Sequence, residues 1–359
     1  MSPTTDHAAA SFPDNLPTVP LFIINYELIK AHDESETERL FIAAKEIGFW
    51  YLKNHGVEDD TEDMFVMGEE TMALPYDEKM RFEQGDSGCS FGYKCAGAVA
   101  TDEDGTPDSI ESINISRDDA LAWPQIVHRT YPTAVNNRME STIMPFIRKS
   151  IEINNVLLEA LERKLELPRG ILASKHSAEE HTSSEVRAIK APKNQHLSNI
   201  KVSLDAHSDY GTITFLHNRV IGGLQVLLPG TDEWMWVKPI PGHAICNLGD
   251  AMVIFSGGIL RSNMHRVVPP PVEQAAHDRW SLAYFTRPGD SVVLEALSSD
   301  SPMIAEAAAK KIGAFDTSVT AADWFARRIR NRRLANRKGP ETWWASRGTE
   351  HSGNPIVAY

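Results

Sequence analysis

Two histidines and one aspartate in this chain have the side chains and the spacing of a metal site. His207 and Asp209 stand two residues apart in LDAHSDYGTITFL, residues 204–216, a segment that otherwise has the composition of a strand. Because successive side chains of a strand alternate between its faces, residues two apart point the same way. His265, in RSNMHRVVPPP, lies near the end of another expected strand. Each histidine taken singly favours a structural role, so only the joint pattern indicates a site.

A charged residue that needs an anion follows in the segment DRWSLAYFTRPG. Arg279 and Ser281 share one face of this expected strand. The opposite face carries Trp280, Leu282 and Tyr284. If that apolar face packs against helices, Arg279 and Ser281 point inward, where a guanidinium is costly unless it meets an anion. An internal carboxylate would satisfy it, and so would a carboxylate ligand held by a two-pronged, charge-assisted hydrogen bond with Ser281 adding a third.

The chemistry of two histidines and one carboxylate is that of a facial metal site with open positions. This ligand set suits non-haem Fe(II), which must bind a co-substrate and oxygen together. Zinc accepts the same three ligands plus water. From these residues alone, a zinc-binding or non-catalytic β-barrel therefore remains an alternative to an iron enzyme.

The elements that must position these residues form a β-rich core between two helical regions. Apolar periodicity, glycines and prolines predict the following order along the chain: strand 19–26, helix 35–48, strand 49–57, two helices within 60–84, a hairpin within 85–118, a long helix over 133–166, short strands over 184–295 and helices over 302–336. Strands recurring every 8–12 residues favour a sandwich, barrel or jelly roll. Ser35 and Glu38 have capping-box spacing at the start of the first helix.

Composition excludes several classes of function. The chain has 359 residues, 42% hydrophobic and 24% charged, as in ordinary globular proteins. A net charge of −13 argues against a nucleic-acid partner and against an anionic membrane surface. No apolar run reaches the roughly 18 residues of a membrane span, and the N-terminus lacks a secretory pattern. Three cysteines without metal-type spacing, Cys89, Cys95 and Cys246, indicate reduced thiols in a cytoplasmic protein. We expect the arginine-rich stretch 327–338 to be a solvated helix face.

The joint pattern resembles the Fe(II)/2-oxoglutarate-dependent oxygenases, in the branch that includes isopenicillin N synthase. His207-x-Asp209, His265 and Arg279-x-Ser281 carry the likeness. VPLFIINYEL is similar to the opening strand of the family, AAKEIGFWYLKNHGV to its N-terminal signature, and IGGLQVLLPGTDEWMWVKPIPGHAICNLGDAMVIFSGGILRSNMHRVVPPP to its second core block. The segment DWFARRIRNRRLANRKGPETWWASRGTE resembles the tail of fungal members.

The resemblance implies a fold and an activity. The fold is a mainly β core, a double-stranded β-helix or jelly roll, with flanking N- and C-terminal helices. It implies one globular unit over 1–359, with an N-terminal family region over 18–130, a jelly-roll catalytic core over 184–295 and a C-terminal helical tail over 302–359. His207, Asp209 and His265 would hold Fe(II), and Arg279 and Ser281 would hold 2-oxoglutarate. With O2, such an enzyme oxidises an unactivated C–H bond of a small metabolite, by hydroxylation, desaturation or ring formation or expansion. Secondary metabolism is the expected setting.

The substrate pocket is less clearly defined than the metal site. Family pockets draw on the loop near 89–115, the outer strands and the C-terminal helices, and the candidates here are Tyr93, Asn114, Arg261 and Phe285. One departure concerns the co-substrate. Where the family often carries Asn-x-Tyr-Pro before the His-x-Asp, this chain has Ile189 and Ala191. An iron oxidase that does not use 2-oxoglutarate therefore stays open as an alternative.

Overall fold

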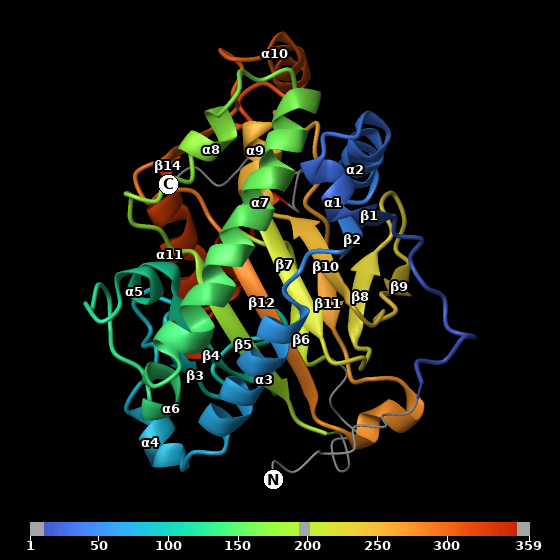
Figure 1. Ribbon diagram of the computed structural model, residues 1–359. Helices are drawn as coiled ribbons and strands as arrows, with labels where there is room; N and C mark the ends of the chain where they lie inside the picture. The colour runs from blue at the N-terminus through green and yellow to red at the C-terminus, as the bar shows by residue number, and fades with distance from the viewer. Residues whose placement is uncertain (1–10, 194–201, 350–359) are drawn as a thin grey trace.

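Two β-sheets form the centre of the computed structural model, which describes residues 11–193 and 202–349 (Figure 1). In the described part of the chain, the larger sheet has eight strands in the spatial order β1 (Ile23–Asn25), β2 (Phe49–Lys53), β10 (His243–Leu248), β7 (Ile213–Asn218), β12 (Arg279–Thr286), β5 (Glu185–Ala191), β4 (Glu111–Ser116) and β3 (Gly92–Lys94). The smaller sheet has the order β6 (Leu204–His207), β11 (His265–Val267), β8 (Leu224–Leu227) and β9 (Trp234–Trp236). β13 (Val293–Glu295) pairs with β14 (Asp316–Thr320).

The two larger sheets enclose the interior of a jelly roll. Apart from the parallel pair β1–β2, the paired strands are antiparallel. Phe49, Tyr51 and Ile245 of the larger sheet pack with Leu224 and Val226 of the smaller one. This apolar contact fills one part of the space between the sheets. The metal-site residues and Arg279, described below, line another part. The expected double-stranded β-helix with flanking helices is confirmed.

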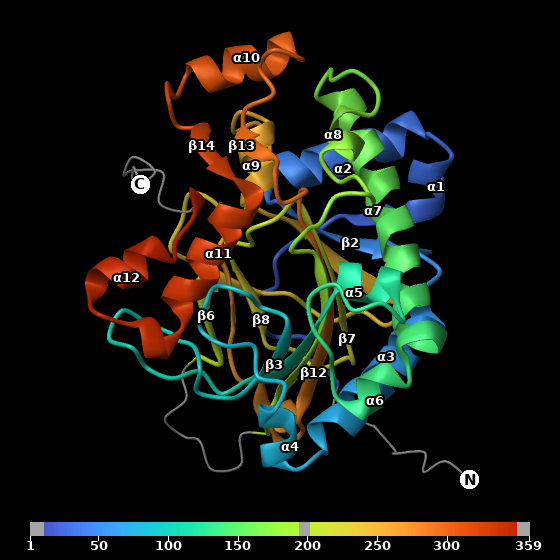
Figure 2. The same cartoon turned by 90° about the vertical axis from the view of Figure 1, so that its left-hand side faces the viewer.

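Helices surround the sheets. Their bounds are α1 (Tyr26–Lys30), α2 (Glu34–Glu46), α3 (Glu58–Met72), α4 (Tyr76–Met80), α5 (Arg117–Ala122), α6 (Thr133–Asn136), the π-helix η1 (Met139–Ile143), α7 (Met144–Lys164), α8 (Ile171–Ser174), α9 (Asp250–Phe255), the 3-10 helix η2 (Val272–Ala276), α10 (Pro302–Ala309), α11 (Ala321–Arg332), the 3-10 helix η3 (Leu334–Asn336) and α12 (Pro340–Ala345). In Figure 2, α3 and α7 cover one side of the larger sheet, and α11 and α12 lie on the opposite side, next to β6.

The helical side of the larger sheet explains the orientation of Arg279. Helix α7 buries residues three and four apart, including Ile153, Leu157 and Leu161, so one apolar stripe faces the sheet. On α3, a Cβ at Gly68 would lie 3.0 Å from Ala188 and 3.5 Å from the Trp280 ring, so the helix packs closely against this face. Because Trp280 faces the helices, the alternation of β12 turns Arg279 toward the interior, as the sequence predicts.

The expectation of one continuous strand through residues 204–216 is wrong. Strand β6 ends at His207, and β7 begins at Ile213 in the other sheet. The intervening turn passes close to the end of β12, where a Cβ on Gly211 would lie 2.2 Å from the carbonyl oxygen of Thr286. The chain therefore changes sheets here, and Asp209 lies on the turn rather than on a strand.

Three further expectations need correction. β1 is shorter than the predicted strand 19–26, and it ends at Asn25, whose side chain accepts a hydrogen bond from Glu27 N and caps α1. Helix α2 is capped by Asp33, which accepts from Glu36 N, rather than by Ser35. The helical pattern over 302–336 is interrupted by β14.

The arginine-rich stretch 327–338 is also not the solvated face that we expected. Arg328 and Arg333 are buried, with 1% and 5% of their surface exposed. Their partners are carboxylates of earlier segments, Asp250 for Arg328 and Glu83 and Asp86 for Arg333. Within the described residues, no helix is both long enough and apolar enough to cross a membrane.

Candidate metal centre and co-substrate site

The predicted metal triad comes together in the interior of the jelly roll. His207 and His265 are direct neighbours in register on β6 and β11, and Asp209 reaches them from the turn after β6. Asp209 Oδ1 lies 3.9 Å from His207 Nε2 and 3.8 Å from His265 Nε2. All three residues are buried, and their ligand atoms lie within 4.8 Å of one another. A single cation between them would contact all three.

Backbone carbonyls set the orientation of both imidazoles. His207 Nδ1 lies 2.7 Å from the carbonyl oxygen of Asp205, and His265 Nδ1 lies 3.1 Å from that of Asn263. A carbonyl oxygen can only accept, so each Nδ1 carries the proton and each Nε2 keeps its lone pair. Burial lowers the pKa of His207 well below its ordinary value, which favours the neutral imidazole that a metal requires. The two rings are thus prepared as ligands.

The Asp209 carboxylate is held so that one oxygen stays directed at the histidines. Its Oδ2 accepts hydrogen bonds from Thr214 Oγ1 at 2.5 Å and from Asn247 Nδ2 at 2.7 Å. Burial raises the pKa of Asp209, but nearby His265 and His207 and these two hydrogen bonds outweigh it, so the net shift is downward. The group is therefore an anion with Oδ1 left for a cation. The donor set of two neutral imidazoles and one carboxylate fits Fe(II).

The second predicted group surrounds Arg279, which is 4% exposed. Its Nε donates to the carbonyl oxygen of Gly222 at 2.8 Å, and its Nη1 to Ser281 Oγ at 2.7 Å. Among the described residues, no carboxylate lies within ion-pair distance of this guanidinium. Burial lowers the pKa of Arg279 to about 10. Among the described residues, Arg279 therefore has no internal carboxylate partner. Of the two explanations for a buried guanidinium, a bound carboxylate ligand remains.

Sequence reasoning missed Asn218, the third member of this group. Asn218 lies opposite Ser281 in the β7–β12 register, and its Oδ1 accepts from Ser281 Oγ at 2.8 Å and from Arg279 Nη2 at 3.3 Å. Alternation along β7 could have found it, because Asn218 shares a face with Thr214. That signal needs the strand boundary, which the sequence placed wrongly.

Ile189 and Ala191, which replace the Asn and Tyr of the family pattern, lie beside Arg279 and Ser281. Ile189 pairs with Ser281 and Ala191 pairs with Arg279 across β5 and β12. Residues directly opposite in an antiparallel pair share a face, so both apolar side chains stand beside the Arg279–Ser281 pair. The positions expected to differ from the family pattern are therefore next to the proposed anion site and not elsewhere in the fold.

The structure divides the four substrate-pocket candidates. Phe285 lies on the interior face of β12, opposite Thr214, which bonds to Asp209. The Arg187 guanidinium lies 4.9 Å from the Phe285 ring. Asn114 shares the interior face, opposite Arg187 in register, but its Nδ2 donates to the carbonyl oxygen of Ser90 at 2.6 Å.

The other two candidates lie elsewhere. Tyr93 points to the helical face, where its hydroxyl donates to Glu111 Oε2 at 2.7 Å and Lys79 lies over its ring. Arg261 is exposed, and its backbone N–H donates to the carbonyl oxygen of Ala44 in α2. The structure therefore brings only Phe285 and Asn114 to the interior face that carries Arg279.

A cationic group that sequence reasoning missed stands beside Phe285. Arg187 and Arg287 share the fully buried carboxylate of Glu185, with nitrogen–oxygen distances of 2.5 and 3.1 Å. Glu185 Oε2 also accepts from Ser90 Oγ at 2.6 Å. Burial raises the pKa of Glu185, but the two arginines and the Ser90 hydrogen bond lower it by more. The net shift is downward, so the carboxyl stays ionised. Two cations and one anion leave this wall of the interior with a net positive charge.

Comparisons with known proteins place the chain in a family. A family model described as 2OG-Fe(II) oxygenase superfamily matches residues 180–288, and one described as the N-terminal region of non-haem dioxygenase in morphine synthesis matches residues 19–135. A 2-oxoglutarate-dependent dioxygenase of Aspergillus fumigatus is 29% identical, over 85% of this chain and 86% of that protein. The 2-oxoglutarate-dependent dioxygenase frbH of Dothideomycetidae sp. is 31% identical, over 79% of this chain and 84% of its own length.

The solved structures show the same fold. Full-length Neurospora crassa T7H in complex with alpha-KG matches with a TM-score of 0.71 and 23% identity, over 89% of this chain and 98% of that one. The fold and the relatives together define a class: the chain belongs to the 2OG-Fe(II) oxygenase superfamily. It is an iron- and 2-oxoglutarate-dependent dioxygenase.

Proposed function

We propose that His207, Asp209 and His265 hold the iron and that Arg279, Ser281 and Asn218 hold the far carboxylate of 2-oxoglutarate. The observation that carries this assignment is the pairing of a preoriented ligand triad with a buried guanidinium that lacks a carboxylate partner among the described residues. When bound, iron and 2-oxoglutarate supply the oxidant for a C–H bond, with succinate and carbon dioxide as by-products.

The protein contributes position, charge and exclusion of water. The triad is buried, and hydrogen bonds to backbone carbonyls, Thr214 and Asn247 fix its side chains, so the metal needs little reorganisation on binding. Arg279 supplies a fixed countercharge in a dry site, where a charge-assisted bond is strong. The interior face of β12 carries both Arg279 and Phe285. One strand would therefore position the co-substrate and the substrate relative to each other.

We propose further that the substrate is a small metabolite with an anionic group. Phe285 and Arg187 would form the recognition surface, and the surplus positive charge of Arg187 and Arg287 over Glu185 supports an anion. Arg187 lies on the interior face of β5, opposite Ala283, and keeps 22% of its side chain exposed. Fungal secondary metabolism is the proposed setting, since the relatives above are fungal dioxygenases. Unpaired Cys89, Cys95 and Cys246 support a cytoplasmic location.

The decisive experiment is a turnover screen that reads succinate from 2-oxoglutarate against matched metabolites. Each pair would share a carbon skeleton and differ in a carboxylate or its amide, so that charge is the only variable. We expect succinate formation to rise with the carboxylates. Arg187→Gln should reduce this preference, while Lys190→Gln, on the opposite face of β5, should leave it unchanged. Equal stimulation by acid and amide in the wild type would contradict the proposed substrate class.

Ile189 and Ala191 beside Arg279 are the two positions at which the co-substrate site departs from the family pattern. The same screen measures how far substrate oxidation remains coupled to 2-oxoglutarate turnover. Substrate consumption without succinate, in the absence of added 2-oxoglutarate, would contradict the assigned role of Arg279.

A further inference from the structure

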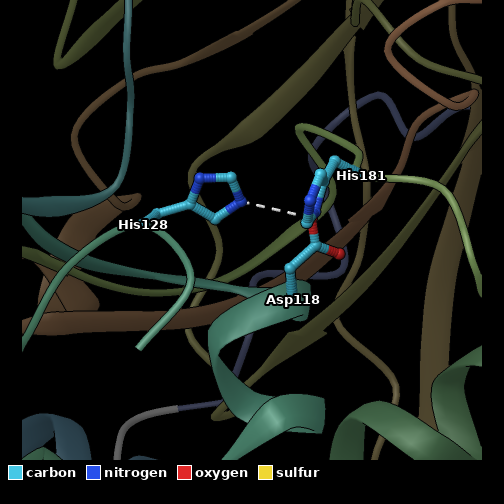
Figure 3. A group of neighbouring side chains, drawn as sticks. All are labelled: Asp118, His128 and His181. Atoms are coloured by element: carbon cyan, nitrogen blue, oxygen red, sulfur yellow. Dashed lines mark hydrogen bonds and ion pairs between the residues drawn. The ribbon is translucent and has the colours of Figure 1, made fainter. Parts of the chain in front are cut away.

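A second group of metal-ligating side chains lies apart from the iron triad (Figure 3). Asp118 stands in the first turn of α5, directly after β4. His128 belongs to the loop after α5, and His181 belongs to the segment before β5. His128 Nε2 lies 3.2 Å from Asp118 Oδ2, and His181 Nδ1 lies 3.3 Å from the same oxygen. Three segments thus direct one ligand atom each at a common point.

The distances leave room for a shared cation, although both contacts also qualify as direct hydrogen bonds. Charge-assisted hydrogen bonds between nitrogen and a carboxylate oxygen measure about 2.7–2.9 Å. Ligand atoms at about 2.1 Å from a tetrahedral zinc ion lie about 3.4 Å from one another. The two distances, 3.2 and 3.3 Å, lie close to the second value. The two imidazole nitrogens lie within 4.8 Å of each other.

Asp118 does not depend on the histidines for its hydrogen bonds. Its Oδ1 accepts from Arg117 Nε at 2.8 Å, and its Oδ2 accepts from the backbone N–H of Thr182 at 3.0 Å. The side chain is 6% exposed, so these contacts fix a buried carboxylate with one oxygen directed outward. The two imidazoles converge on an oxygen that is already hydrogen-bonded, which is the second coordination shell that metal sites have.

His128 is likewise held in place before any ion arrives. The backbone N–H groups of Val127 and His128 donate to Asp119 Oδ1 at 2.9 and 2.7 Å. The His128 ring lies 4.9 Å from the Phe91 ring, centroid to centroid. His128 and His181 keep 27% and 68% of their side chains exposed, so an ion can enter from solvent and a water molecule can complete the coordination sphere. Asp118 is therefore fixed by hydrogen bonds, the backbone of His128 is held by Asp119, and His181 is the most exposed of the three ligands.

We propose that Asp118, His128 and His181 form a zinc-binding site with water as the fourth ligand, separate from the iron triad. The ligand set of two imidazoles, one carboxylate and water is one that zinc accepts. The bound ion would join three segments: the end of β4 with α5, the loop that carries His128, and the segment leading into β5. Because β5 carries Arg187 and Glu185, the ion would stabilise the strand that forms one wall of the interior.

The first test counts zinc on the full chain by equilibrium dialysis and elemental analysis. We expect the double variant His128→Ala/His181→Ala to bind one equivalent fewer than the wild type. His277→Ala, which removes an exposed histidine outside the cluster, is the matched control and should bind as the wild type does. His265→Ala should lose the equivalent held by the catalytic triad and keep the one held by the cluster. Equal zinc content in the double variant and the wild type would overturn the proposal.

The second test follows thermal unfolding, which a ligand stabilises only if it binds the native state. Zinc should raise the Tm of His265→Ala, in which the triad is incomplete. The triple variant His265→Ala/His128→Ala/His181→Ala should show no such rise. A rise of equal size in both proteins would contradict the cluster as the binding site. Because the triad is disabled in both, this outcome does not bear on the proposed iron ligands.

Discussion

Arg332 in α11 forms a buried ion pair with Asp205, the residue whose backbone carbonyl orients the iron-site histidine His207. Asp205 is fully buried, and Arg347 Nη2 contacts its other oxygen at 3.1 Å. Arg347 also donates to the carbonyl oxygen of Ala206. Helix α11 and the segment after α12 therefore hold the strand that leads into the metal triad, and we expect the tail to affect iron binding without touching the iron.

Arg332→Met should destabilise the fold and weaken iron binding together. The substitution leaves Asp205 buried with one arginine instead of two, and losing a partner of a buried pair costs on the order of 3 kcal/mol. Disturbing a group that orients a ligand lowers metal affinity by about 10–100-fold. Urea unfolding and Fe(II) titration would measure the two effects. Arg330→Met, in the same helix but bonded to the carbonyl oxygen of Ser87, is the control. Wild-type iron affinity in Arg332→Met would show that the ion pair does not position His207.

Removing any one proposed iron ligand should abolish iron binding and turnover. His207→Ala, Asp209→Ala and His265→Ala each leave two protein ligands, which hold Fe(II) weakly. Chelation should inactivate the wild type reversibly, and added Fe(II) should restore succinate formation. His277→Ala should behave as the wild type. Normal iron content and turnover in His265→Ala would mean that the triad is misassigned.

Arg279→Leu should raise the apparent KM for 2-oxoglutarate by at least about a hundredfold. The buried carboxylate of the co-substrate loses its countercharge, at a cost on the order of 3–5 kcal/mol, and each 1.4 kcal/mol corresponds to a factor of ten. Arg279→Lys should fall between, because an ammonium keeps the charge but loses the planar fork. Iron occupancy should stay at the wild-type level in both variants, as measured by elemental analysis.

Asn218→Ala tests the residue that only the structure revealed. It removes an acceptor shared by Arg279 and Ser281, so we expect a smaller rise in KM for 2-oxoglutarate than in Arg279→Leu. Succinate formation across a 2-oxoglutarate titration would measure it. An unchanged KM in both Arg279→Leu and Asn218→Ala would refute this anion site.

Glu185 should make stability depend on pH. Its pKa in the folded protein is depressed by Arg187 and Arg287 against the opposing effect of burial. A depressed carboxyl pKa contributes stability that is fully present above the unfolded value, about 4.3, and is lost as pH falls through the folded value. Glu185→Gln should therefore lower the free energy of unfolding most at pH 7, and the difference from the wild type should shrink below about pH 4. A difference independent of pH would contradict the ionised, paired state.

The sequence by itself determined which residues could do the chemistry. His207, Asp209, His265 and the Arg279–Ser281 pair were identifiable because residue type and period-two alternation are local properties. The helices α3 and α7 and the hairpin of β3 and β4 were predictable for the same reason, since apolar spacing records which face is buried.

The tertiary structure decided how those residues meet. Asp209 reaches the histidines from a turn between two sheets, a crossing set by the close approach of Gly211 to Thr286 and not by any local preference. Asn218 and Asn247 join the site through register with strands distant in the chain. The position of Arg332 follows from its pairing with the buried Asp205. Such partners lie far apart in sequence, so periodicity along one segment carries no record of them, and only the folded chain brings them into contact.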